Sequence, residues 1–318
     1  MTAAESRRIL VTGSSGFVGR HLLPLLKSSF PSAEIFAERI DVTNRDAVVR
    51  AVRGVRPDAC IHLAAISSVV AAGHHPEPTW RVNLEGTLNI AQAVLEYAPG
   101  CRLLFASSSE IYGESFASGH PLDESALLAP MNHYAATKAA ADLALGSLAN
   151  DGLRVVRLRL FNHVGPGQSE AFVVASFARQ IARIEAGRQP PRLLVGALDS
   201  QRDFLDVRDV GSAYVACLRV ASKLPRGAIL NIASGIPRRI GDILNELINI
   251  SGLRPDIIPD AARMRRSEIM SASGDAARAR QLLGWSPKTP WAQTLADVLT
   301  DWRKLMASND TPYEPLPG

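Results

Sequence analysis

The N-terminal segment places the strongest constraint on the fold. Ile9–Thr12 is an apolar run typical of a buried parallel strand, and it leads into a turn with glycines at positions 13, 16 and 19. An apolar helical pattern follows over residues 22–26. Glycines at this spacing allow a tight turn and a close approach of backbone to ligand, and the next helix presents its N-terminus to a phosphate. This order of elements predicts a dinucleotide-binding unit.

Strand and helix patterns alternate after this unit, which predicts an α/β fold with a doubly wound parallel sheet of the Rossmann type. Strands are expected at 34–37, 59–64, 102–107 and 154–160, and helices at 43–55, 77–97 and 132–150. Later patterns predict helices at 172–187, 206–221, 238–251 and 290–306, with short strands at 192–195 and 228–232.

These patterns suggest two domains and a tail. We expect a dinucleotide-binding domain over residues 1–160 and a smaller mixed α/β substrate domain mainly over 161–308, with some segments returning to the first domain. The tail, residues 309–318, is rich in proline and is expected to be loose.

Composition excludes several classes of function. The three cysteines, Cys60, Cys101 and Cys217, are widely spaced without a CxxC pair, so we expect neither a disulfide framework nor a metal site. With no apolar leader and no long apolar run, we expect a cytoplasmic protein without a membrane partner. A net charge of +4 without a basic block argues against nucleic-acid binding, and a phosphorylated small substrate explains the scattered arginines better.

A second pattern predicts a hydride-transfer site. Tyr134 and Lys138 are four residues apart, so on a helix over 132–150 both side chains lie on one face. A tyrosine acts as a general acid near neutral pH only if its pKa is lowered, and we expect the Lys138 charge to lower it. Ser108 is expected to share the substrate oxygen with Tyr134.

With these residues in order, the chain resembles the extended short-chain dehydrogenase/reductases that act on nucleotide sugars. In that superfamily, Asp41 matches a position that meets the adenine, and 63–65 match a strand end beside the cofactor. Asn83 matches a polar position beneath the active-site helix, although a hydrogen bond within its own helix is an equal alternative. The cofactor-binding residues implied are Gly13, Ser15, Gly16, Phe17, Val18, Gly19, Arg39, Asp41, Val42, Leu63, Ala64, Ala65, Tyr134, Lys138 and Phe161.

The second half of the chain resembles the GDP-4-keto-6-deoxy-D-mannose reductases within this superfamily. The resemblance is carried by the stretches 161–168, 172–181, 195–210 and 265–268. It implies a GDP-sugar substrate and reduction of its C4 ketone to give GDP-D-rhamnose. Arginines suit the diphosphate and a carboxylate suits a ribose diol. The substrate-binding residues implied are Ser108, Ser109, Glu110, Asn162, Val173, Arg179, Arg202, Arg265 and Glu268.

Other activities remain open at this point. Glu110 stands where GDP-mannose 4,6-dehydratases need a carboxylate for elimination of water, so it is a further catalytic candidate. The arginine-rich loop of the dehydratases has no counterpart between Ala37 and Asp41. Another nucleotide-sugar 4-epimerase or 4-reductase is a further alternative, and a dinucleotide-sensing regulator is the non-enzyme alternative.

Two more expectations concern the cofactor and the assembly. Glu38 would favour NAD(H), whereas Arg39 or Arg20 would favour the 2′-phosphate of NADP(H), which is the cofactor that we expect. By analogy, the helices over 76–97 and 132–150 are expected to pair across a two-fold axis in a homodimer.

Overall fold

A computed structural model describes residues 7–264 and 269–308. At its centre is a six-stranded sheet in the order β2-β1-β3-β4-β5-β9, and every neighbouring pair is parallel. The strands are β1 (Arg8–Thr12), β2 (Glu34–Phe36), β3 (Ala59–His62), β4 (Arg102–Ser108), β5 (Arg154–Leu160) and β9 (Ala228–Ile232). The strand order reverses between β1 and β3, which places a ligand crevice at the carboxyl ends of these strands. The predicted α/β fold with a Rossmann-type parallel sheet is confirmed.

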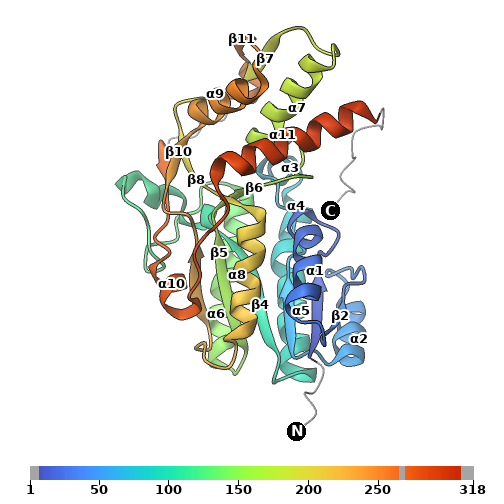
Figure 1. Ribbon diagram of the computed structural model, residues 1–318. Helices are drawn as coiled ribbons and strands as arrows, with labels where there is room; N and C mark the ends of the chain where they lie inside the picture. The colour runs from blue at the N-terminus through green and yellow to red at the C-terminus, as the bar shows by residue number, and fades with distance from the viewer. Residues whose placement is uncertain (1–6, 265–268, 309–318) are drawn as a thin grey trace.

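Helices cover both faces of this sheet (Figure 1). On one face, α1 (Phe17–Ser29) packs beside α8 (Val207–Arg219), and on the other lie α2 (Arg45–Val55), α5 (Gly86–Tyr97) and α6 (His133–Asn150). Strand β1 shows why two faces form, because Ile9 and Val11 enter one apolar core while Leu10 enters the other.

A helical path runs from residue 76 to 97, where the sequence predicts one helix over 77–97. It consists of α4 (Pro76–Trp80), a π-helical turn η1 (Arg81–Glu85) and α5. The helix α3 (Val69–His74), which precedes it, was not predicted. The π turn contains Asn83, so the irregularity lies at a polar residue beside the site.

A second lobe lies above the carboxyl edge of the large sheet in Figure 1. It holds β6 (Asn162–Val164), β8 (Gln201–Asp206), β10 (Pro237–Arg239) and β12 (Ser271–Ala272), together with the pair β7 (Arg192–Val195) and β11 (Asp256–Pro259). Three helices share its apolar core: α7 (Val173–Glu185), α9 (Ile240–Ser251) and α11 (Trp291–Ala307).

Two segments expected in the smaller domain belong instead to the lobe that contains the large sheet. The predicted strand at 228–232 is β9, which pairs with β5, and the predicted helix at 206–221 is α8, which packs against α1. Both have apolar patterns of the same kind as the segments of the second lobe, so periodicity alone could not tell which core they enter. A short helix, α10 (Ala277–Leu283), also packs against β9.

The described helices include none that is both long and apolar enough to cross a membrane. The predicted tail, 309–318, lies outside the described residues.

Candidate active site

The glycine turn joins β1 to α1 and packs against the end of β3. Gly13 has φ +69°, and a Cβ there would lie 2.5 Å from the backbone nitrogen of Ala64. Leu63 donates its backbone N–H to Thr12 at 3.1 Å, which holds the two strand ends together. Gly16 is the N-cap of α1, so the first-turn amides of this helix are left for an anion. The turn therefore fits the pyrophosphate of a dinucleotide.

The remaining predicted cofactor residues surround this turn. Ser15 is exposed, Phe17 and Val18 are half-buried on α1, and Ala65 is half-buried after β3. Ser14 donates its hydroxyl to the Ala37 carbonyl at 2.7 Å, which draws the segment after β2 toward the glycines.

The residues predicted to contact the ribose and the adenine lie on the segment after β2. Arg39 and Glu38 are both exposed, whereas Val42 is buried against Gly86. Asp41 accepts hydrogen bonds from the Thr43 hydroxyl and backbone N–H, and these lower the pKa of Asp41. The side chain of Val42 is thus part of the core, and only its backbone could meet a cofactor.

The catalytic candidates meet where β4 ends and α6 begins. Ser108 is the last residue of β4, and Tyr134 and Lys138 lie on the first turns of α6. Asn132 caps this helix by accepting from the Ala135 N–H at 2.8 Å. Ser108 hydrogen-bonds to the phenol of Tyr134. The fold therefore brings the two hydroxyls together, while their shared contact with a substrate oxygen stays a prediction.

Burial governs the protonation of Tyr134. Desolvation raises its pKa to about 12, the hydrogen bond from Ser108 lowers it, and the charge of Glu110 raises it. The predicted net lowering of this pKa by Lys138 is therefore wrong for this structure, because desolvation of the phenolate outweighs the favourable contacts.

Lys138 also has a pKa that differs from that of an exposed lysine. Its side chain is buried, and Nζ lies 4.3 Å from the centroid of the Phe105 ring. Burial lowers the pKa of Lys138 to about 7, and the nearby Asp142 carboxylate raises it. The ammonium thus exchanges its proton near neutral pH.

Glu110 lies beside Ser108 and Asn132. Its backbone N–H donates to the Ser108 hydroxyl at 3.2 Å, and its carboxylate accepts from Asn132 Nδ2 at 3.4 Å. Ser109, which was predicted to touch substrate, is buried. The acid is therefore held between the end of β4 and the cap of α6.

A buried polar chain that sequence reasoning did not predict runs behind the site. His62 Nδ1 lies 2.7 Å from the Thr12 hydroxyl, and its Nε2 lies 3.0 Å from the Thr87 hydroxyl. Thr87 donates to the Asn83 carbonyl at 2.7 Å, so it accepts from His62 Nε2, and Nδ1 in turn accepts from Thr12. Asn83 Nδ2 donates to the Thr137 hydroxyl on α6 at 3.0 Å, so the alternative of a purely internal helix bond is wrong.

The predicted substrate residues are spread over the second lobe. Asn162 is half-buried at the start of β6, opposite Phe204 of β8, and Val173 is the exposed first residue of α7. Arg202 on β8 donates to the carbonyl of Ile269 at 3.2 Å. Arg265 and Glu268 lie outside the described residues.

Phe161 differs from its prediction as a cofactor contact. Its ring is only 1% exposed and packs against Tyr112 and Phe116, with ring centroids 6.5 and 6.1 Å away. Its side chain is part of the core, so only its backbone could meet a ligand.

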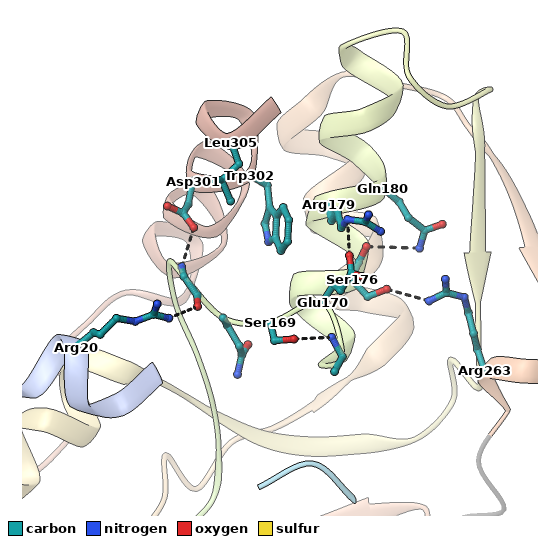
Figure 2. A pocket seen from close by; sticks show the side chains of 13 residues that line it. Arg20, Ser169, Glu170, Ser176, Arg179, Gln180, Arg263, Asp301, Trp302 and Leu305 are labelled. Atoms are coloured by element: carbon teal, nitrogen blue, oxygen red, sulfur yellow. Dashed lines mark hydrogen bonds and ion pairs between the residues drawn. The ribbon is translucent and has the colours of Figure 1, made fainter. Parts of the chain in front are cut away.

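A cavity of about 530 Å³ lies between α1, the loop 167–171, α7 and α11 (Figure 2). Arg179 lines it and pairs with Glu170, and Arg263 donates to the Ser176 hydroxyl at 3.0 Å. The residues that line it include Arg179 but not Asn162 or the catalytic candidates. The structure thus separates Arg179 from the other predicted substrate residues.

Arg20, considered as a reader of the 2′-phosphate, donates to the Gly167 carbonyl at 2.8 Å (Figure 2). Its guanidinium is directed to the loop of the second lobe, so Arg39 is the better placed candidate. Within the described part of the chain, no cluster of three or more His, Cys, Asp or Glu side chains could hold a metal ion.

Comparison with known proteins supplies the family. A family model described as the NAD dependent epimerase/dehydratase family matches residues 9–233. The chain belongs to this family. The resemblance to extended short-chain dehydrogenase/reductases is thereby confirmed, and the chain is an NAD(P)-dependent oxidoreductase by family.

Individual relatives narrow the comparison. The chain is 40% identical to the GDP-6-deoxy-D-mannose reductase of Pseudomonas aeruginosa, over 93% of this chain and 97% of that protein. It is 30% identical to the GDP-6-deoxy-D-talose 4-dehydrogenase of Aggregatibacter actinomycetemcomitans, over 87% and 91% of the two chains. A solved structure described as RMD from Pseudomonas aeruginosa complexed with NADPH superposes with a TM-score of 0.85 at 37% identity, covering 94% and 98%.

Proposed function

We propose that this protein reduces the C4 ketone of GDP-4-dehydro-6-deoxy-D-mannose to give GDP-6-deoxy-D-mannose, also called GDP-D-rhamnose. The observation that carries the proposal is the 40% identity to a GDP-6-deoxy-D-mannose reductase over nearly the whole of both chains. The bonded Ser108 and Tyr134, with Lys138 one turn away, provide the groups that a carbonyl reduction needs.

The described residues support a separate catalytic role for each of these side chains. The nicotinamide cofactor, when bound, supplies a hydride to the C4 carbon. Tyr134 carries its phenolic proton at physiological pH, and it donates this proton to the C4 oxygen, because the alkoxide that develops there is more basic than a phenolate even of raised pKa. Ser108 donates a hydrogen bond to the same oxygen and so stabilises the charge that develops on it. Lys138 in its ammonium form holds the nicotinamide ribose and favours the tyrosinate that remains after proton transfer.

We propose NADP(H) as the preferred cofactor. Gly13, Gly16 and the N-terminus of α1 fit the pyrophosphate, as the open first turn of this helix indicates. Arg39 is exposed after β2, where a guanidinium can pair with a 2′-phosphate, and the neighbouring solved structure is complexed with NADPH. Glu38 next to it would serve the free hydroxyl of NAD(H), so the ratio of the two affinities is the measurement that decides.

Substrate binding is assigned to the second lobe. Asn162 and Arg202 lie on the neighbouring strands β6 and β8. A guanidinium there can pair with the diphosphate. Val173 is exposed at the first turn of α7 and is assigned to the nucleoside. We leave Arg179 out of this set because it pairs with Glu170 in the separate cavity.

A dehydratase is the second candidate, and Glu110 is the observation that favours it. Its carboxylate acts electrostatically on Tyr134 and so lies within reach of the site. To separate the two activities, the protein is incubated with GDP-mannose alone and with the 4-keto sugar plus NADPH or NADH. Consumption of cofactor only with the ketone supports the reductase, whereas formation of the ketone from GDP-mannose alone would replace it with the dehydratase.

Tyr134→Phe tests the proton donor. Because this change removes one hydroxyl and leaves the ring, we expect turnover to fall by at least about 10²-fold, while the affinity for NADPH changes little. Product formation by mass spectrometry and NADPH binding by fluorescence measure the two effects. Equal turnover in the variant would contradict the assignment of Tyr134.

A further inference from the structure

Asp142 lies one helical turn after Lys138, on the same face of α6, and its side chain is fully buried. Its carboxylate accepts a hydrogen bond from the Ser107 hydroxyl at 2.7 Å. It also pairs with Arg157 at 3.1 Å and with Arg159 at 3.1 Å, and both arginines come from β5. One carboxylate therefore ties the active-site helix to the two central strands beneath it.

The contacts of Asp142 continue into a network across the sheet. Arg159 donates to the Tyr112 hydroxyl at 3.0 Å, and Tyr112 donates to Asn231 on β9 at 2.7 Å. The backbone N–H of Asn231 donates to Glu124 at 2.7 Å. The network thus joins α6, β5 and β9, and Asp142, Arg159, Tyr112 and Asn231 are all hydrogen-bonded within it.

The chain makes room for this cluster. A Cβ on Gly146, one turn beyond Asp142 on α6, would lie 2.6 Å from a guanidinium nitrogen of Arg157. The glycine therefore allows an arginine to reach the buried face of the helix. A buried ion cluster is no better for stability than well-packed apolar side chains, so its presence calls for another role.

That role follows from what Lys138 faces. Its Nζ lies over the apolar Phe105 ring, and burial lowers the pKa of Lys138 to about 7. Asp142 is the group that opposes this by raising the pKa of Lys138. His62, from β3, is buried nearby and is kept neutral because burial and the Lys138 charge lower its pKa to about 3.

We propose that Asp142 is a positioning residue that keeps Lys138 in its ammonium form and holds α6 against β4 and β5, so that Ser108, Tyr134 and Lys138 share one site. This inference rests on the proposed function, because it acts through the role assigned there to Lys138. Arg157 and Arg159 balance Asp142 and set how much of its negative charge Lys138 experiences.

Other ionisable groups are placed to affect Lys138 less. Glu110 acts on Tyr134. The helical elements that pack against α6 from the other side are α3, α4, η1 and α5. Tyr97 at the end of α5 is half-buried, but it is neutral at physiological pH because its pKa is raised above the usual value near 10. The other ionisable side chains of these elements are exposed to solvent, where charges are screened: His74, His75, Glu77, Arg81, Glu85 and Glu96.

The protonation of Lys138 can be measured directly. The chain has only five lysines, so a protein labelled with 13C at the lysine ε-carbon gives few signals, and Lys138→Met assigns the one of interest. We expect Asp142→Asn to lower the titration midpoint of Lys138 by about one pH unit. Arg157→Gln should raise it, because less of the Asp142 charge is then neutralised.

A matched control removes a carboxylate from the same helix. Asp151 is the exposed C-cap of α6, about 20 Å along the helix from Lys138, so Asp151→Asn should leave the midpoint unchanged. Circular dichroism checks folding, and if Asp142→Asn does not fold, the upward shift in Arg157→Gln carries the test. If Asp142 only stabilised the fold, the two variants would not shift the titration midpoint of Lys138 in opposite directions.

The pH profile of kcat connects this measurement to the reaction. We expect its descending limb to move to lower pH in Asp142→Asn and to higher pH in Arg157→Gln, in step with the NMR midpoints. Absence of turnover in the unmodified protein would overturn the proposed function and leave the NMR result standing. An unmoved Lys138 midpoint in a folded Asp142→Asn, or shifts of the same sign in both variants, would overturn this inference.

Discussion

At the scale of residues, burial opposes charge on both partners of the proposed proton transfer. It raises the pKa of Tyr134 to about 12 and lowers that of Lys138 to about 7. The spacing of the two residues predicted that they share a helix face, and the fold places them so. It could not predict their protonation, because desolvation depends on Phe105 and the strands that cover them.

The lowered pKa of Lys138 predicts a pH dependence with a definite sign. As pH rises through about 7, the ammonium loses its proton, so kcat should fall on the alkaline side with a midpoint near that value. Lys138→Arg keeps the positive charge at all pH values tested and should move the limb upward, at the cost of some activity. A limb that stays near neutral pH in this variant would show that another group titrates.

At the scale of elements, the site depends on how the β1–α1 turn fits the end of β3. The sequence predicted the turn and both strands, because glycine spacing and apolar runs are local signals. The π turn at Asn83 and the position of β9 are not local, since each depends on partners far along the chain, Thr137 for Asn83 and β5 for β9. These features therefore required the structure.

Gly13→Ala tests whether the β1–α1 turn must pack closely against the end of β3. The new Cβ would meet the backbone nitrogen of Ala64 at 2.5 Å, and φ is +69°, so both the turn and the cofactor site should be distorted. We expect a loss of stability of about 1–3 kcal/mol and weaker NADPH binding. Gly54→Ala on α2 is the control, because a Cβ there has nothing within 4 Å, and helix propensity should make it slightly stabilising.

Thermal unfolding and NADPH titration by fluorescence measure both variants. Unchanged NADPH affinity in a folded Gly13→Ala would show that this turn does not carry the cofactor. The comparison with Gly54→Ala removes the general effect of exchanging glycine for alanine.

At the scale of the whole molecule, the two lobes meet on the helix that is proposed to hold the cofactor. The rings of Phe17 and His163 stack with centroids 6.0 Å apart, and His21 lies 2.8 Å from the Pro166 carbonyl. The loop that follows Asn162 is thus seated on the first turns of α1. Binding of a cofactor at α1 and of a sugar at β6 should therefore influence each other.

The proposed homodimer is tested on the face formed by α5 and α6, which pack side by side. Leu143 on α6 is 59% exposed, as expected for an apolar side chain that a second copy covers. We expect a dimer in sedimentation velocity, and Leu143→Asp should shift it toward monomer because a carboxylate would be buried at the interface. Leu282→Asp on α10, where the leucine is 39% exposed, is the control and should stay dimeric. A monomeric unmodified protein, or a Leu143→Asp variant that remains a dimer, would remove α6 from the interface.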